Sequence, residues 1–541
     1  MRDVRSGLDL LMGAVILLLL VACVNVAHLF MARGLGRGRE LAVRRALGAS
    51  TPSLVGHLAV ESLLLGLAGG LGGVVLAFVG LRAFMGLNPD SLPRAAEIGL
   101  DPRILAFAAA LSVITALVFG LLPALRTMGR GQDPTLRPSA RGGTANRNDQ
   151  VLRHGLIVAE VAVSLVLVAS ASLLLRTFVE VQRQEPGFDT AGVWTIPLTP
   201  REVDSPASYR LQMDEVRERV AGVVGVRSAA YGLTMPFELT GGGRCCWRST
   251  MSSVSSGDET APWIHPVSPE YFATLGVELL HGASWSAVDA TSSPIPAVVN
   301  EAFAIELFGS AGGALGQVLL RAGEGSMQFL VTGVARNTRY FGLDAEPEPN
   351  VFIPIEVLPF PITRSHLAVR VSAADPGLGG RLREAVWAAA PTLPVPTVRS
   401  MEGWMDHGTA RRRFDSALFA AFGLVALLLA AGGLYGTLLY VASQRRRELA
   451  IRQALGASRA KIERWMLRGG LLVATAGVVL GLLGSWGAAR FLESRLWGVE
   501  PSDPLALFGA AGLLLLVAAV ASWLPARWAG RTDPMEALQA E

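Results

Sequence analysis

The sequence predicts a polytopic α-helical membrane protein that carries an α+β domain outside the membrane. Its 541 residues are 51% hydrophobic and only 17% charged, whereas soluble domains average about 25% charged residues. The apolar residues gather in long runs, and a helix needs about 20 such residues to cross a bilayer. We predict seven transmembrane helices, at 8–31, 54–84, 104–125, 156–175, 414–442, 469–492 and 505–524.

Arginine residues mark alternate loops between the predicted spans. They cluster after the first, third and fifth spans and in the tail after the seventh, while the loops at 85–103 and 493–504 balance their few arginines with acids. By the positive-inside rule, the basic loops face the cytoplasm. We therefore expect the N-terminus and the segment 179–410 outside, and the C-terminus in the cytoplasm. Arginines that flank apolar runs indicate contact with a lipid bilayer and not with nucleic acid.

One basic segment occurs twice. RGRELAVRRALGAS occupies 37–50 and RRRELAIRQALGAS occupies 445–458, each after an apolar run. Downstream, DPRILAFAAAL at 101–111 corresponds to DPLALFGAAGL at 503–513. Repetition of this order predicts two copies of one three-span unit.

The repeat suggests a division of the chain into five parts. These are a first three-span unit (1–135), a cytoplasmic linker (136–153), a transmembrane helix (154–178), an extracytoplasmic domain (179–410) and a second three-span unit (411–541). A span and an outer domain precede only the second copy. We therefore expect that the matching parts of the first copy are missing, as in an N-terminally truncated product.

The outer segment alternates strand-like and helix-like runs. The strand-like runs lie at 297–303, 329–335 and 350–355, and the helix-like runs at about 207–223 and 379–390. Such a mixture predicts an α+β fold.

The repeated segment predicts a short cytoplasmic helix followed by a sharp corner. Glu448 and Arg452 stand four residues apart with the acid first, the better orientation on a helix, and Glu40 and Arg44 repeat this pair. Gly456 is placed to end the helix in a left-handed conformation. Ser458 follows as an N-cap for the next helix.

A simpler interpretation is that the cations only fix orientation and bind anionic lipid. That interpretation suits the scattered arginines. Orientation and lipid binding need positive charge, but they need neither a glutamate nor an Ala-Leu-Gly corner, nor the same order twice. The repeated motif therefore favours a specific contact.

Few other residues suggest chemistry. A P-loop needs a glycine-rich loop before a lysine, and the only lysine, Lys461, has none. The seven histidines form no metal-binding motif, so we expect no metal, no cofactor and no enzymatic activity. Cys245 and Cys246 suggest two partly buried thiols in preference to a strained disulfide. Asn25 and His28 are expected to hydrogen-bond between helices, and Glu160 to be a local charge near the inner interface.

Several segments resemble a known family. ELAIRQALGAS, LVACVNVAHLFMARG (20–34) and LIVAEVAVSLVLVASASLLLRT (156–177) resemble the FtsX-like/MacB-like permeases of ABC transporters. VSPEYFATLGVELLHG (267–282) resembles the MacB-type core domain of that family. The duplication resembles its duplicated orphan (ADOP-type) permeases, with the first outer domain and first span absent.

The resemblance implies a mechanotransmitter in the bacterial inner membrane. A separate cytoplasmic ABC ATPase dimer would close on ATP, and the helices would relay that motion to the outer domain for export or extraction of a substrate. The repeated motif would contact the ATPase, one copy per subunit. Its expected contact residues are Glu40, Arg44, Arg45, Leu47, Gly48, Glu448, Arg452, Gln453, Leu455 and Gly456.

Two alternatives stay open. One is an FtsX-like regulator without transport, whose outer domain switches an envelope enzyme as its partner protein. The other is an inactive, truncated permease. The sequence does not name a substrate.

Overall fold

The computed structural model forms two compact units. Met1–Glu180 and Arg412–Glu541 form a helical unit, and Val181–Arg411 forms an outer unit. The described residues are 2–36, 44, 47, 50–87, 99, 101–129, 147–199, 205–237, 243–244, 247–249, 261–286, 293–321, 327–358, 364–373, 375–394, 397–444, 446–455, 457–493 and 496–530.

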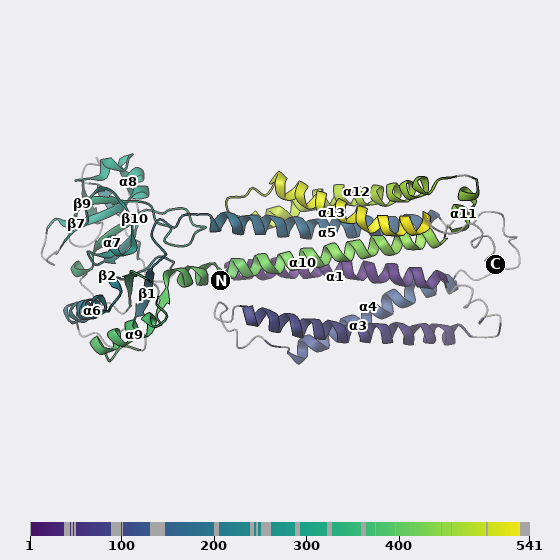
Figure 1. Ribbon diagram of the computed structural model, residues 1–541, viewed down its shortest axis with the longest axis horizontal. Coiled ribbons are helices and arrows are strands. Elements are labelled where there is room, and N and C mark those ends of the chain that lie inside the picture. Colours follow the sequence, from purple (N-terminus) through teal and green to yellow (C-terminus); the bar gives the residue numbers. More distant parts are fainter. Residues whose placement is uncertain are drawn as a thin grey trace. The chain divides into compact units, whose positions relative to one another are not determined.

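The helical unit consists of long helices that run side by side (Figure 1). The bounds of these long helices are α1 Arg2–Gly36, α3 Thr51–Leu87, α4 Pro102–Gly129, α5 Arg147–Gln182, α10 Met401–Gln444, α12 Arg459–Leu492 and α13 Pro504–Gly530. A short helix, α11, spans Arg446–Ala454, and residues 401–411 of α10 and 181–182 of α5 belong to the outer unit. In the described part of the chain, α1, α3, α5, α10, α12 and α13 are long and apolar enough to cross a membrane. The third predicted span lies on the 28-residue α4, whose stretch Pro102–Val118 is apolar.

The predicted fold class is therefore confirmed, with helices that extend beyond the predicted spans. α5 begins at Arg147, inside the predicted linker, and α10 begins at Met401, ahead of the predicted second unit. Polar turns of a helix continue past an apolar run at no cost in hydrogen bonding, so hydropathy alone underestimates helix length.

The two copies of the three-span unit pack their last two helices alike. The repeated motifs align when 408 is added to each residue number of the first copy. Gly66 then corresponds to Ala474, and Gly70 to Val478. A Cβ at Gly66 would lie 2.6 Å from Ala116 Cβ on α4, and one at Gly70 would lie 3.2 Å from Ser112 Oγ. Ala474 and Val478 lie one and two turns after Gly470, where a Cβ would lie 2.7 Å from Ser522 Oγ on α13, and both are buried in a cluster that α5, α10 and α13 share. The same face of each helix therefore meets its neighbour.

A polar contact joins three helices inside the helical unit. Asn25 of α1 donates to Glu160 Oε1 of α5 over 2.5 Å and to the Leu429 carbonyl of α10 over 3.0 Å. Asn25 thus makes the predicted interhelical hydrogen bonds. The expectation for Glu160 was wrong, because its side chain is only 2% exposed. The helices packed around α5 bury a carboxylate that hydropathy had placed near the inner interface.

Asn25→Leu is expected to destabilise the helical unit by about 1 to 2 kcal/mol, since the substitution removes an interhelical hydrogen bond and one donor to a buried carboxylate. Unfolding of the full chain in mixed micelles by increasing SDS measures the change. Val24→Leu, on the neighbouring position of α1, is the matched control. Equal midpoints for the two variants would contradict the prediction.

The outer unit is built on a mixed sheet. The order of its main path is β12-β1-β11-β2-β5-β10-β7-β9-β8-β4, with β3 paired to β5 and β6 to β9. The β5–β10 and β7–β9 pairs are parallel. The strands are β1 Val193–Leu198, β2 Val226–Gly232, β3 Gly243–Arg244, β4 Trp247–Ser249, β5 Trp263–Val267, β6 Leu279–Gly282, β7 Ile295–Asn300, β8 Val318–Arg321, β9 Gln328–Ala335, β10 Asn350–Pro354, β11 Ser365–Val371 and β12 Arg399–Ser400.

Helices cover the two faces of this sheet. On β10, Val351 and Ile353 join one apolar cluster while Phe352 joins another, as expected where successive side chains point to opposite faces. α6 (Pro206–Ala221), α8 (Glu301–Phe308) and α9 (Leu378–Ala389) contribute to the first cluster, and α7 (Tyr271–Leu275) to the second. The alternating runs of the sequence therefore build an α+β core.

Four of the five predicted elements of the outer segment match helices or strands closely. The run 297–303 does not, because β7 ends at Asn300 and α8 begins at Glu301. The Asn300 side chain accepts a hydrogen bond from the Phe303 backbone amide over 3.0 Å. This N-cap starts a helix inside a run that was predicted as one strand.

A buried histidine lies at the centre of the outer unit. His265 on β5 is 1% exposed. Its Nδ1 accepts from the Thr234 hydroxyl over 2.8 Å, and its Nε2 donates to Asn350 Oδ1 over 2.9 Å. Burial lowers the pKa of His265 to about 4, against the opposing effect of the Asn350 hydrogen bond. The ring is therefore neutral at pH 7.

Candidate functional site

The second copy of the repeated motif forms a short helix that is fixed to the bundle by one apolar side chain. α11 carries Glu448, Leu449 and Arg452. Leu449 is 4% exposed and packs in a cluster with Ala442, Ile462, Met466 and Ala526, which belong to α10, α12 and α13. A helix of nine residues is too short to be stable alone, so this cluster holds α11 in place.

The charged residues of α11 make the predicted ion pair and one further contact. Arg452 Nη2 lies 2.5 Å from Glu448 Oε1, and both side chains are 46% exposed. The Arg452 guanidinium also lies over the Trp465 ring of α12, at 5.4 Å from its centroid. The exposed pair adds little stability. Together with Trp465, however, it fixes the direction of the arginine on the surface.

The chain turns sharply after α11. The Ala457 amide donates to the Arg452 carbonyl over 2.9 Å, which is the longer hydrogen bond of a Schellman ending. Ser458 occupies the N-cap of α12, with φ −67° and ψ 149°, but its side chain makes no capping hydrogen bond. The described residues on both sides of Gly456 thus form a helix ending followed by the N-cap of α12, where Ser458 serves through its backbone conformation.

Both copies of the motif present a leucine at the corner. Leu455 is 83% exposed, and Leu47, the corresponding residue of the first copy, is 82% exposed. Ile451, on the last turns of α11, is 45% exposed beside Leu455. A large apolar side chain that projects from a turn outside an apolar span gains most when a partner covers it. The repeat keeps this feature at the same position in both copies.

The remaining predicted residues of the motif are only partly located. Arg44 and Gln453 are half-buried. Glu40, Arg45, Gly48 and Gly456 lie outside the described residues, as do Cys245 and Cys246. Trp465 is a residue of this surface that the sequence motif did not indicate. Trp465 follows Ser458 by two helical turns, and that spacing brings an α12 side chain beside the corner.

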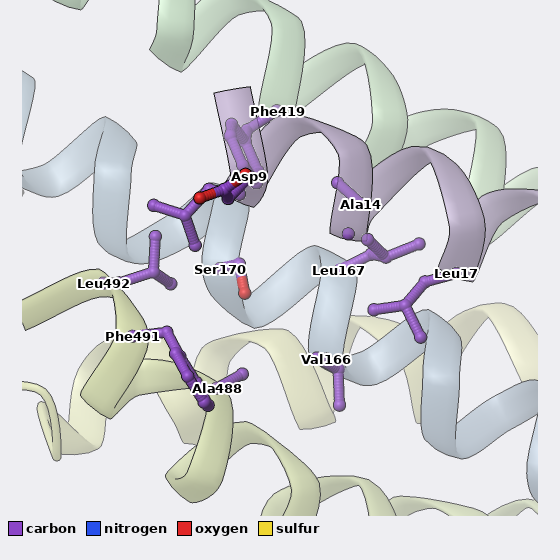
Figure 2. A pocket seen from close by; sticks show the side chains of 12 residues that line it. Asp9, Ala14, Leu17, Val166, Leu167, Ser170, Phe419, Ala488, Phe491 and Leu492 are labelled. Carbon is purple, nitrogen blue, oxygen red and sulfur yellow. The ribbon is translucent and has the colours of Figure 1, made fainter. Parts of the chain in front are cut away.

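An apolar cleft of about 500 Å³ lies elsewhere in the helical unit, between α1, α5, α10 and α12. Figure 2 shows Leu17, Val166, Leu167 and Phe491 around it, with the Asp9 carboxylate and the Ser170 hydroxyl as polar groups. This lining suits an acyl chain better than a hydrated polar solute. Among the described residues, no group of three His, Cys, Asp or Glu side chains is placed to hold a metal ion.

The fold and the motif together define a class: a membrane protein with a duplicated three-helix unit, a repeated surface corner and an α+β outer unit. Residues 12–131 and 420–534 match the family model of the FtsX-like permease C-terminal domain, and residues 155–387 match that of the MacB-like periplasmic core domain. The chain belongs to the FtsX-like/MacB-like permease family, as its sequence predicted.

Curated relatives include macrolide export ATP-binding/permease proteins. MacB of Shewanella oneidensis is 26% identical over 304 residues, which cover 51% of this chain and 43% of that protein. MacB 1 of Aeromonas hydrophila is 30% identical over 293 residues, with the same coverage. The aligned part therefore spans less than half the length of these relatives.

Solved structures include the periplasmic region of MacB from Actinobacillus actinomycetemcomitans. It is 12% identical with a TM-score of 0.29, and the alignment covers 41% of this chain and 95% of that one. The extracellular domain of the transporter YknZ from Gram-positive bacteria is 16% identical with a TM-score of 0.27, covering 38% and 99%.

Proposed function

We propose that this chain is the permease subunit of an ABC-type system, driven by a separate cytoplasmic ATPase. The observation that carries the proposal is the pair of corner leucines, Leu47 and Leu455, each more than 80% exposed at equivalent positions. Two equivalent contacts suit a dimeric ATPase with one motif per subunit. The helices would relay ATP-driven motion to the outer domain, without hydrolysis by this chain.

The contact on the ATPase would combine apolar and charged groups. Leu455 would enter an apolar pocket, while the Glu448–Arg452 pair, held over Trp465, would set the register at its edge. The other proposed contact residues are Arg44, Gln453, Glu40, Arg45, Gly48 and Gly456. Since α11 is fixed to α10, α12 and α13 through Leu449, a push on the corner would move these helices together.

The arginine-rich motif loops support a cytoplasmic position for the proposed contact, by the positive-inside rule. The protein would then be an inner-membrane protein with the segment 179–410 outside and the division at 135, 153, 178 and 410 described above. The apolar lining of the cleft in Figure 2 supports a relay of motion over passage of a polar substrate between these helices.

Leu455→Asp is expected to weaken binding of the partner ATPase about 30-fold, corresponding to about 2 kcal/mol, since a charge would enter an apolar pocket. The measurement is the affinity of the purified full chain in detergent for the ATPase that co-purifies with the wild-type chain from its native membranes.

Val224→Asp is the matched control, because Val224 is 85% exposed and lies in the outer unit. The control should bind the ATPase as the wild type does. If Leu455→Asp also binds with unchanged affinity, or if no ATPase co-purifies with the wild type, the proposed coupling is wrong.

A further inference from the structure

In the second copy of the three-span unit, two glycines of α12 let α5 approach to backbone contact. A Cβ at Gly477 would lie 2.6 Å from Val161 Cβ and 2.9 Å from the Val158 carbonyl oxygen. One at Gly481 would lie 2.9 Å from the Ala162 carbonyl oxygen and from Leu165 Cβ. These distances exclude any side chain at the two positions. Gly477 and Gly481 therefore form the surface on which a transmembrane helix packs, which we call the glycine seat.

The first copy has glycines at the two corresponding positions, and no described helix packs on them. The 408-residue offset places Gly69 at the position of Gly477 and Gly73 at that of Gly481. Both are exposed, and a Cβ built on either meets no described atom within 4 Å. Leu76, which corresponds to Gly484, is 74% exposed. Gly66 and Gly70 face α4, as their counterparts on α12 face α13. α3 therefore has the same rotation about its axis as α12, and its open glycine face corresponds to the face of α12 that α5 covers.

We propose that the Gly69–Gly73 face of α3 is a docking site for a transmembrane helix other than those of residues 1–541, one that presents a β-branched residue and a leucine four positions apart. The occupant is a helix because α5, with Val161 and Leu165 in that spacing, fills the same seat in the same chain. Small residues that admit a neighbouring backbone are typical of helix pairs in membranes.

Two other occupants fit the observations less well. A second copy of this chain would have to offer its own α5, whose Val161 and Leu165 are already buried at 2% and 0% exposure. Lipid acyl chains fill any apolar surface and give no reason for the same glycine spacing to occur where a helix sits in the other copy. The proposal stands independently of the proposed ATPase contact.

The test uses the full chain in phosphatidylcholine vesicles and a synthetic peptide of residues 147–182 as the probe helix. Cysteines are first replaced by serine, and Leu76→Cys in the chain is paired with Val166→Cys in the peptide. A Cβ at Gly484, the counterpart of Leu76, would lie 3.1 Å from Val166 Cγ2. We expect a disulfide cross-link at this pair.

The controls lie on the same helix. Leu71→Cys replaces a residue that is 69% exposed and whose counterpart, Val479, is 54% exposed, so it should cross-link at least tenfold less. Gly73→Ile should lower the yield at Leu76→Cys at least tenfold. Gly72→Ile, whose counterpart Leu480 is 53% exposed, should leave it unchanged. Both glycines have open space for a Cβ, so both variants should fold, as size-exclusion chromatography checks.

Equal yields at positions 71 and 76, or a yield that Gly73→Ile does not change, would overturn the proposal and leave α3 facing lipid alone. Cross-linking of Leu76→Cys to the Val166→Cys of a second full-length chain, in preference to the peptide, would also overturn it and identify a second copy as the occupant.

Discussion

Gly477→Leu is expected to destabilise the helical unit by about 3 kcal/mol, at the upper end of the cost of overpacking. The new side chain would begin 2.6 Å from Val161 Cβ and 2.9 Å from the Val158 carbonyl oxygen. Neither atom is the end of a flexible side chain, so α5 has to move away from α12 as a whole. Within a membrane, where packing supplies much of helix association, this loss is not offset by burial elsewhere.

The duplication provides a control at the corresponding position. Gly69→Leu places the same side chain in open space and should leave stability unchanged or raise it by up to about 1 kcal/mol, since leucine favours a helix over glycine. SDS-induced unfolding of the two variants in mixed micelles measures the difference. Similar midpoints for both variants would show that α5 does not depend on the glycine seat.

Lowering the pH from 7 to 4 is expected to cost the outer unit about 3 kcal/mol through His265 alone. The folded-state pKa of about 4 lies below the ordinary value of 6.5. Between these values the unfolded chain binds a proton at this histidine and the folded chain does not. The contribution is therefore fully present above pH 6.5, is lost as the pH falls, and changes no further below pH 4.

The His265→Gln variant isolates this contribution from that of the carboxyl groups. Guanidinium unfolding of the full chain, followed by near-ultraviolet circular dichroism at pH 7 and pH 4.5, should show a smaller pH dependence for the variant than for the wild type. His281→Gln, at an exposed histidine, should retain the wild-type dependence. Identical slopes for wild type and His265→Gln would refute the neutral, buried state of His265.

Much of the helical unit was predictable because its signals are local. Apolar runs predicted the spans, and the order Glu448, Arg452, Gly456, Ser458 predicted a helix with an ion pair followed by a corner. The orientation of the termini stays a prediction. The candidate contact was predictable only in part: the exposure of Leu455 follows from the corner, whereas the position of Trp465 under Arg452 follows from the packing of α11 on α12.

The errors arose where contacts over long sequence distances decided the outcome. Glu160 lies near the end of an apolar run, which suggested a surface charge, yet Asn25 from a distant helix hydrogen-bonds to it. The run 297–303 was predicted as one strand, although Asn300 and Glu301 lie at its centre. The Asn300 cap divides it into strand and helix. Hydropathy averages over a window and does not register one side chain that accepts a backbone hydrogen bond.

The sequence by itself determined the membrane class, six of the seven predicted spans, the duplication, the repeated motif and the family of this protein, because composition, spacing and repetition are properties of neighbouring residues. It also presented Gly69 and Gly477 as equivalent. Only the tertiary structure distinguished them: α5 covers Gly477 and leaves Gly69 open. The physical reason is that a glycine carries no side chain, so its role depends wholly on which other backbone approaches it.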